Sequence, residues 1–183
     1  MLTIELKETE YYDRDSNTFF TVPAYTLQLE HSLYSLSEWE AKTKKSLLET
    51  LEHGMSTEET FEYIKCMDLN VPPSENVYFT LTKDDLVKIQ QYIDDPHTAT
   101  TITTLNPNQN QPVKKQKITA EIIYYWMIEA EIPFECERWN LNKLIMLIRV
   151  VSAKRNNGKM SNKDLKKFNK AEMAKRRAKC RGH

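Results

Sequence analysis

The chain has 183 residues, 40% of them hydrophobic and 28% charged, which is enough for one globular domain with extensions. Its formal net charge is zero, but residues 154–183 carry twelve Lys or Arg against two acidic residues, so residues 1–153 hold a net charge of −10. Only three glycines occur, and this scarcity argues against an all-β fold with its many tight turns.

The same composition argues against secretion and membrane insertion. Residues 1–7 show no basic segment followed by an apolar one, so we expect no targeting signal there. The longest apolar runs are far too short to cross a bilayer. Three widely spaced cysteines fit neither a disulfide framework nor a zinc site, which indicates reduced thiols in a cytosol.

The first thirty residues predict a small antiparallel β element. Leu2–Lys7 and Tyr25–Glu30 alternate apolar and polar residues, which is the period of a strand with one face on a core. We expect the charged stretch Glu8–Asn17 to be the connection between them, with Phe19, Phe20 and Val22 leading into the second strand. Because Pro23 cannot donate to a strand ladder, the second strand lies at a sheet edge or begins after this residue.

Helical periodicity dominates the next part of the chain. Apolar residues recur at helical spacing over Leu33–Leu51, a stretch that one of three nearby serines can cap and that Gly54 ends. Ser56 and Thr82 each begin a further helix, because acidic side chains follow in the first turn. Pro96 then marks the end of the helix that begins at Thr82.

The second half of the body has a polar segment followed by its most hydrophobic helices. Thr98–Lys117 lacks a helical period, and we favour a β-hairpin, Thr100–Leu105 against Val113–Ile118, over a simple loop. Ala120–Glu131 is apolar on every side, so we expect this helix to run through the core centre or into a partner. Apolar residues on one stripe predict a last core helix over Asn140–Ser152.

These elements predict a mainly α fold with a small antiparallel β element (α+β). We expect an acidic, α-rich globular domain over residues 1–153, with an N-terminal β-hairpin, and a basic extension over residues 154–183. The extension offers few side chains to bury, and helix nucleation is costly, so we expect it to be flexible or only marginally helical.

No motif in the sequence points to catalysis, a cofactor or a metal. The chain lacks the dinucleotide, P-loop, serine-hydrolase and zinc-protease patterns. The Asp and His residues of Asp94–His97 suit a divalent ion by type, but polar residues collect at helix ends, so we interpret this cluster as a helix terminus. Glu30–Ser32 resembles a catalytic triad only loosely, and we assign His31 to backbone groups at a strand-to-helix corner.

The basic extension has three interpretations. We favour contact with an acidic protein partner or with another copy of the chain, for which Lys175, Arg176, Arg177 and Lys179 are candidate residues. Nucleic-acid binding through phosphate neutralisation is the alternative, although Phe168 is the only aromatic residue of the extension and no DNA-binding motif accompanies it. The third interpretation is a solvated tail that improves solubility.

Several stretches of the chain resemble a family of bacteriophage proteins. They are Leu27–Lys42 (LQLEHSLYSLSEWEAK), Tyr92–Thr100 (YIDDPHTAT), Ile118–Ile128 (ITAEIIYYWMI), Pro133–Phe134, Trp139–Leu144 (WNLNKL) and Leu147–Arg149. They lie between residues 27 and 149, and the resemblance covers most of that part of the chain. This part resembles the tail assembly chaperones of tailed bacteriophages and, more distantly, the baseplate-hub assembly proteins of contractile-tailed phages.

The resemblance implies a non-enzymatic assembly factor without a cofactor. Such a protein would act in the host cell cytoplasm and bind the tape measure protein or another tail or baseplate-hub protein. A structural component of the virion tail or baseplate is the alternative, and a nucleic-acid-binding protein is a second one. Leu33, Leu36 and Trp39, with Trp126, are candidates to line a partner-binding groove, although the same segments also suit the core.

Overall fold

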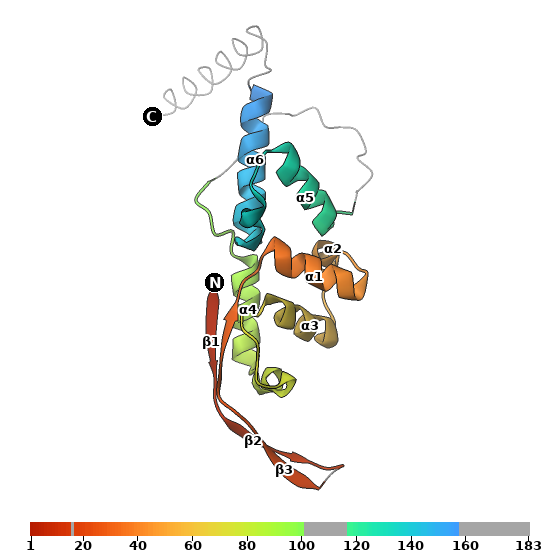
Figure 1. The fold of residues 1–183 in the computed structure, drawn as a ribbon, viewed down its shortest axis with the longest axis vertical. Helices are drawn as coiled ribbons and strands as arrows, with labels where there is room; N and C mark the ends of the chain where they lie inside the picture. Colours follow the sequence, from red (N-terminus) through yellow and green to blue (C-terminus); the bar gives the residue numbers. More distant parts are fainter. Residues whose placement is uncertain (16, 101–116, 158–183) are drawn as a thin grey trace, which may run out of the picture. The chain divides into compact units, whose positions relative to one another are not determined.

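The computed structural model describes residues 1–15, 17–100 and 117–157 (Figure 1). The strands are β1 (Leu2–Leu6), β2 (Thr9–Asp13), β3 (Thr18–Val22) and β4 (Tyr25–Leu29). The α-helices are α1 (Leu33–Thr43), α2 (Leu47–His53), α3 (Thr57–Met67), α4 (Lys83–Asp94), α5 (Ala120–Glu129) and α6 (Leu141–Asn157), and the 3-10 helices are η1 (Glu75–Thr80) and η2 (Phe134–Arg138). The predicted mainly α fold with a small antiparallel β element is confirmed.

The chain divides into two compact units, Met1–Ile148 and Arg149–His183, and the description that follows concerns the first. The boundary predicted from the sequence lies between residues 153 and 154, whereas the division in the structure lies within α6. The predicted hairpin over residues 100–118, apart from its ends, and the candidate residues of the basic extension lie outside the described residues. None of the helices in the described part combines the length and apolarity that a bilayer crossing requires.

The strands form two antiparallel pairs, β1 with β4 and β2 with β3. Leu2 lies opposite Leu29 in the first pair, and β4 begins after Pro23, as the missing N–H of proline allows. The prediction that Glu8–Asn17 only connects two strands is wrong, because this stretch contains β2 and leads into the second pair. These two strands show no alternation of apolar and polar residues in the sequence, because the hairpin buries few side chains and so needs no apolar face.

Beside β4, a short segment after α3 adds to the sheet. The N–H of Leu69 donates to the carbonyl of Gln28 at 2.8 Å. One carboxylate oxygen of Asp68 accepts hydrogen bonds from the hydroxyls of Tyr25 (2.8 Å) and Tyr78 (3.0 Å), which joins β4 to η1. Burial, together with the Asp68 carboxylate, raises the pKa of both tyrosines, so they stay neutral donors.

Helix α1 is the centre of the helical body and packs against α2, α3, α5 and η2. Its predicted serine cap is Ser32, whose side chain accepts the N–H of Ser35. The helical stretch expected over Leu33–Leu51 is interrupted: α1 ends at Thr43, Lys44 adopts a left-handed conformation (φ 59°), and α2 restarts behind its own cap. The helix starts predicted at Ser56 and Thr82 are confirmed as capping boxes.

His31 lies buried at the corner between β4 and α1. Its ring Nδ1 is 2.5 Å from the hydroxyl of Tyr63, so the expectation that this ring serves backbone groups is wrong. Its carbonyl accepts the N–H of Leu141 at 2.7 Å and ties the corner to the start of α6. Burial lowers the pKa of His31 to about 4, against the opposing charge of Glu30, so the ring is neutral at pH 7.

The buried His31 gives a pH-dependent stability. In the unfolded chain His31 titrates near 6.5, whereas its folded pKa is about 4. The unfolded state therefore binds more protons between these values, and the stabilising contribution, complete above the unfolded pKa, is lost as the pH falls through the folded pKa. We expect the free energy of unfolding to decrease by about 2 kcal/mol between roughly pH 7 and pH 5 through this residue.

Urea denaturation of the wild type and of His31→Gln across this pH range measures that contribution. Other titrating groups are shared by the two proteins, so the variant should show a flatter profile whatever its absolute stability. Parallel profiles would show that His31 does not carry the effect.

Candidate protein-binding surface

Glu40 is an acidic side chain on the buried face of α1, and it joins two other helices. One carboxylate oxygen accepts the N–H of Leu47 at 2.9 Å, and the other accepts the N–H of Ala120 at 2.8 Å. These are the first residues of α2 and α5. The first N–H groups of a helix lack partners within the helix and carry the positive end of its dipole, so a carboxylate suits both.

The surroundings of Glu40 reinforce the link. The Ser46 hydroxyl donates to the carbonyl of Ile118 at 2.8 Å and so fixes the segment that enters α5. Burial raises the pKa of Glu40, while the two N–H groups favour the ionised form and oppose that rise. We refer to Glu40 and its two N–H donors as the Glu40 clamp.

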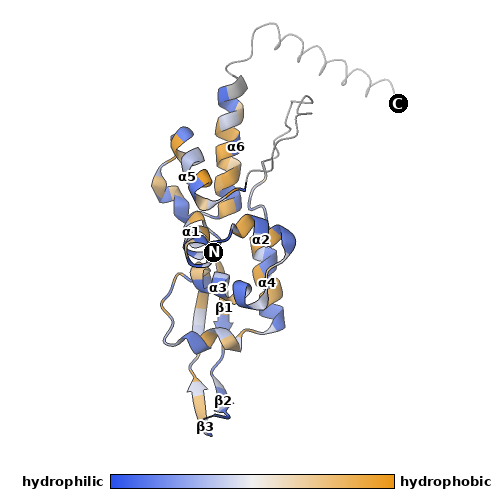
Figure 2. Ribbon diagram, turned by 90° about the vertical axis from the view of Figure 1, so that its right-hand side faces the viewer, coloured by the Kyte–Doolittle hydropathy of each residue, from blue (hydrophilic) through white to orange (hydrophobic). Residues whose placement is uncertain are grey.

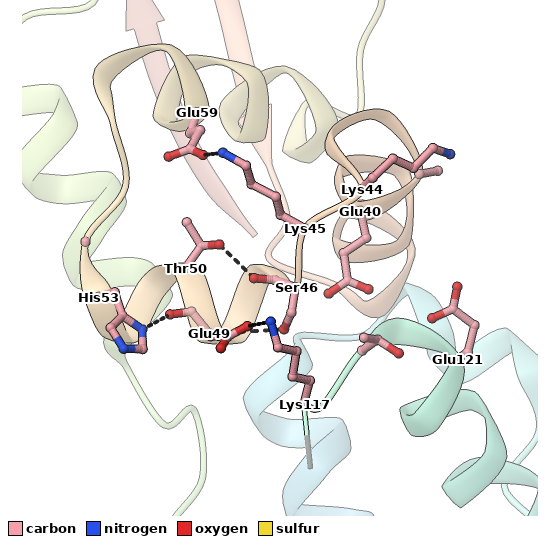
Figure 3. A pocket seen from close by; sticks show the side chains of 13 residues that line it. Glu40, Lys44, Lys45, Ser46, Glu49, Thr50, His53, Glu59, Lys117 and Glu121 are labelled. Atoms are coloured by element: carbon pink, nitrogen blue, oxygen red, sulfur yellow. Dashed lines mark hydrogen bonds and ion pairs between the residues drawn. The ribbon is translucent and has the colours of Figure 1, made fainter. Parts of the chain in front are cut away.

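An open pocket of about 890 Å³ lies beside the clamp, between the end of α1, α2, the start of α3 and the entry to α5 (Figure 3). Two ion pairs lie in it: Lys45 with Glu59 at 2.6 Å and Lys117 with Glu49 at 2.8 Å. The ring Nδ1 of His53 lies 2.8 Å from the Glu49 carbonyl rather than beside a nucleophile. The pocket therefore presents ion pairs at a junction of helices rather than groups converging on one bound atom.

The Asp94–His97 cluster is held by local bonds. The Asp95 carboxylate accepts the N–H of His97 at 2.7 Å, and the Asp94 carboxylate accepts the amide of Gln90 at 3.0 Å. Within residues 1–15, 17–100 and 117–157, no three His, Cys, Asp or Glu side chains are grouped to hold a metal ion. The contacts of the cluster are those of a helix terminus.

Helix α5, which the clamp positions, is exposed along one side. Only Ala120, Ile123 and Met127 of this helix are fully buried. Tyr125 is 60% exposed and Ile128 is 59% exposed. Of the two alternatives predicted for this helix, a path through the core centre is therefore wrong, and contact with a partner stays a prediction: α5 packs by one face and leaves the other to solvent.

The exposed side of α5 continues onto η2. Phe134 is 55% exposed, and its ring lies 6.2 Å from that of Tyr124, whose hydroxyl donates to Glu137 at 2.7 Å. Tyr124 and Ile128 are neighbours on the helix surface, as residues four apart are, and Tyr125 is three residues from Ile128. We call this surface, made of Tyr125, Ile128 and Phe134 around Tyr124, the α5–η2 face.

Three of the residues predicted to bind a partner lie in the core rather than on this surface. Leu33, Leu36 and Trp39 are completely buried, and the Trp39 indole donates to the Glu59 carbonyl at 3.2 Å. Their assignment to a binding groove is wrong, because α1 is covered by helices on several sides. Trp126 is half-buried, and Lys175, Arg176, Arg177 and Lys179 lie outside the described residues.

The sequence did carry a sign of the clamp. Glu40 is seven residues after Leu33 and four after Leu36, so it lies on the stripe of α1 that is otherwise apolar. A charged group on a buried stripe needs hydrogen-bond donors, and one of them, the N–H of Ala120, is far along the chain. The sequence near Glu40 does not indicate which N–H groups those donors are.

The Glu40 clamp leads to a stability prediction. Glu40→Gln places an amide NH₂ against one of the two helix N–H groups and leaves that donor without an acceptor. We expect a loss of about 1–3 kcal/mol in the free energy of unfolding, the usual cost of a buried unsatisfied group. Urea denaturation measures it, and Glu38→Gln, an exposed position on the same helix, is the matched control. Equal stability of both variants would contradict a role for the clamp.

Comparison with known proteins identifies no relative. No protein-family model, no curated protein and no solved structure matches the chain. The resemblance to phage tail assembly proteins therefore stays a prediction.

Proposed function

We propose that this chain is a non-catalytic assembly factor that binds another protein through the α5–η2 face. The observation that carries the proposal is the exposure of Tyr125, Ile128 and Phe134, three large apolar side chains on neighbouring elements. Isolated apolar residues on a protein surface are common, but neighbouring ones of this size are typical of interaction sites.

The chemistry of the face suggests the kind of partner. Glu121, Glu129, Glu131, Glu135 and Glu137 lie on α5, on η2 and between them, with Arg138 as the one basic residue of the segment 120–138. Arg138 is placed over the ring of Tyr34 at 4.8 Å. An amphipathic helix with an apolar stripe and basic flanks would match this apolar centre and acidic surroundings.

The biological setting comes from the sequence resemblance. A tape measure protein is long and helical, and a chaperone would cover its apolar stripes until the tail tube encloses them. We therefore propose a tail assembly chaperone of a tailed bacteriophage, acting in the host cell cytoplasm on the tape measure protein or a baseplate-hub protein. A tail or baseplate component of the mature virion is the rival proposal.

A surface variant tests the binding face. Tyr125→Ser with Ile128→Ser removes two exposed apolar side chains, so we expect the stability to change little and the binding to fall at least roughly tenfold. Val87→Ser, at a 54% exposed position of α4, is the matched control. The measurement is co-elution with, and soluble yield of, the co-expressed tape measure protein or baseplate-hub protein. Unchanged binding by the double variant would exclude the α5–η2 face.

The role in assembly is tested by quantitative mass spectrometry of purified virions beside the infected-cell lysate. A chaperone should be abundant in the lysate and absent from the virion. A fixed copy number per particle would replace the chaperone proposal by the structural one.

A further inference from the structure

The β2–β3 hairpin, which we call the arm, is exposed over most of its surface. Of its described residues only Val22 is fully buried. One contact of the arm with the rest of the unit is the hydrogen bond that the hydroxyl of Tyr11 donates to the Phe79 carbonyl at 3.3 Å. On its outer side the rings of Tyr12 and Phe19 lie 5.0 Å apart, and Phe19 is 68% exposed.

An arm of this kind is incomplete as a sheet. A two-stranded ribbon is marginally stable in water and usually needs a third strand or a packed face. Among the described residues no third strand joins β2 and β3. Both strands therefore lie at sheet edges, and an edge strand is a template for pairing with another chain.

The two edges differ in charge. β2 carries Glu10 and Asp13, whereas β3, Thr18–Val22, has no charged residue. Figure 2 shows a matching contrast in hydropathy, with β2 largely blue and β3 pale to orange. Acidic residues protect an edge against identical strands, because pairing would bring like charges together. Only the β3 edge therefore suits an identical chain.

We propose that two copies of the chain associate through β3, antiparallel about a two-fold axis, into one four-stranded sheet with β2 at each outer edge. An isologous contact of this kind is closed, so it stops at a dimer. A two-fold axis normal to the sheet keeps the Tyr12–Phe19 pairs of both copies on the same face. With the axis between the two Phe19 residues, the four rings form one aromatic row, which shields Phe19 from water.

The acidic residues remain compatible with this arrangement. Glu10 and Asp13 are on β2 and so lie at the outer edges of the four-stranded sheet, away from the two-fold axis. They then prevent addition of further copies, so the sheet does not extend into a fibre. The inference is independent of the α5–η2 face, which belongs to other elements.

Sedimentation velocity of the full chain, with two matched variants, tests the proposal. Phe19→Lys and Tyr12→Lys remove one ring each from the same cross-strand pair and add the same charge, but on different edges. We expect a dimer for the wild type and for Tyr12→Lys. Phe19→Lys should weaken the dimer at least roughly tenfold in Kd, because its charge lies on the paired edge.

A further variant guards against loss of the arm itself. Thr21→Lys also adds a charge to β3, but it lies opposite Glu10 and can form an ion pair across the arm. It should keep the circular dichroism spectrum of the wild type and still weaken the dimer. A monomeric wild type at all accessible concentrations would overturn the proposal. So would equal effects of Phe19→Lys and Tyr12→Lys, or a dimer lost only when Tyr125 and Ile128 are replaced.

Discussion

One buried carboxylate holds the helical body together. The Glu40 clamp supplies acceptors to the first N–H of α2 and the first N–H of α5, two helices that are far apart in the sequence. A charge in the interior is costly unless hydrogen bonds compensate for lost water, and helix N-termini compensate well because their dipoles add to the bonds. The position of α5, and with it the orientation of the α5–η2 face, depends on this interaction.

The clamp also explains why α5 has two different sides. Its N-terminus is tied to α1, and Ile123 and Met127 pack inward, so the opposite side faces solvent. A helix with apolar residues on all sides, of which only one side is covered, leaves apolar side chains exposed that another protein can bind. The arm shows the same imbalance in β structure, with Phe19 exposed beside an uncharged strand edge. The α5–η2 face belongs to helices whose positions the core fixes, which favours binding with little rearrangement.

Local patterns in the sequence predicted much of the fold. The caps at Ser56 and Thr82 lie beside the helices they begin, so side chain and N–H are only three residues apart and the pattern is readable. Apolar and polar residues alternate along β1 and β4 because one face of these strands is buried. The arm has no such buried face, so its strands were not predicted. The surface side of α5 was not predicted either, because composition alone does not reveal which side of an apolar helix is covered.

The long-range bonds of this unit have a consequence for the order in which it forms during synthesis. Strands β1 and β4 and helices α1, α3 and α4 meet one another before the chain reaches residue 95. The hydrogen bonds from the N–H of Ala120 to the Glu40 carboxylate and from the N–H of Leu141 to the His31 carbonyl, however, can form only later in synthesis. On the ribosome the N-terminal part can therefore condense first, with two polar sites still hydrated. When α5 and α6 have been synthesised, their N–H groups replace that water, so this unit completes its folding only after both helices have emerged.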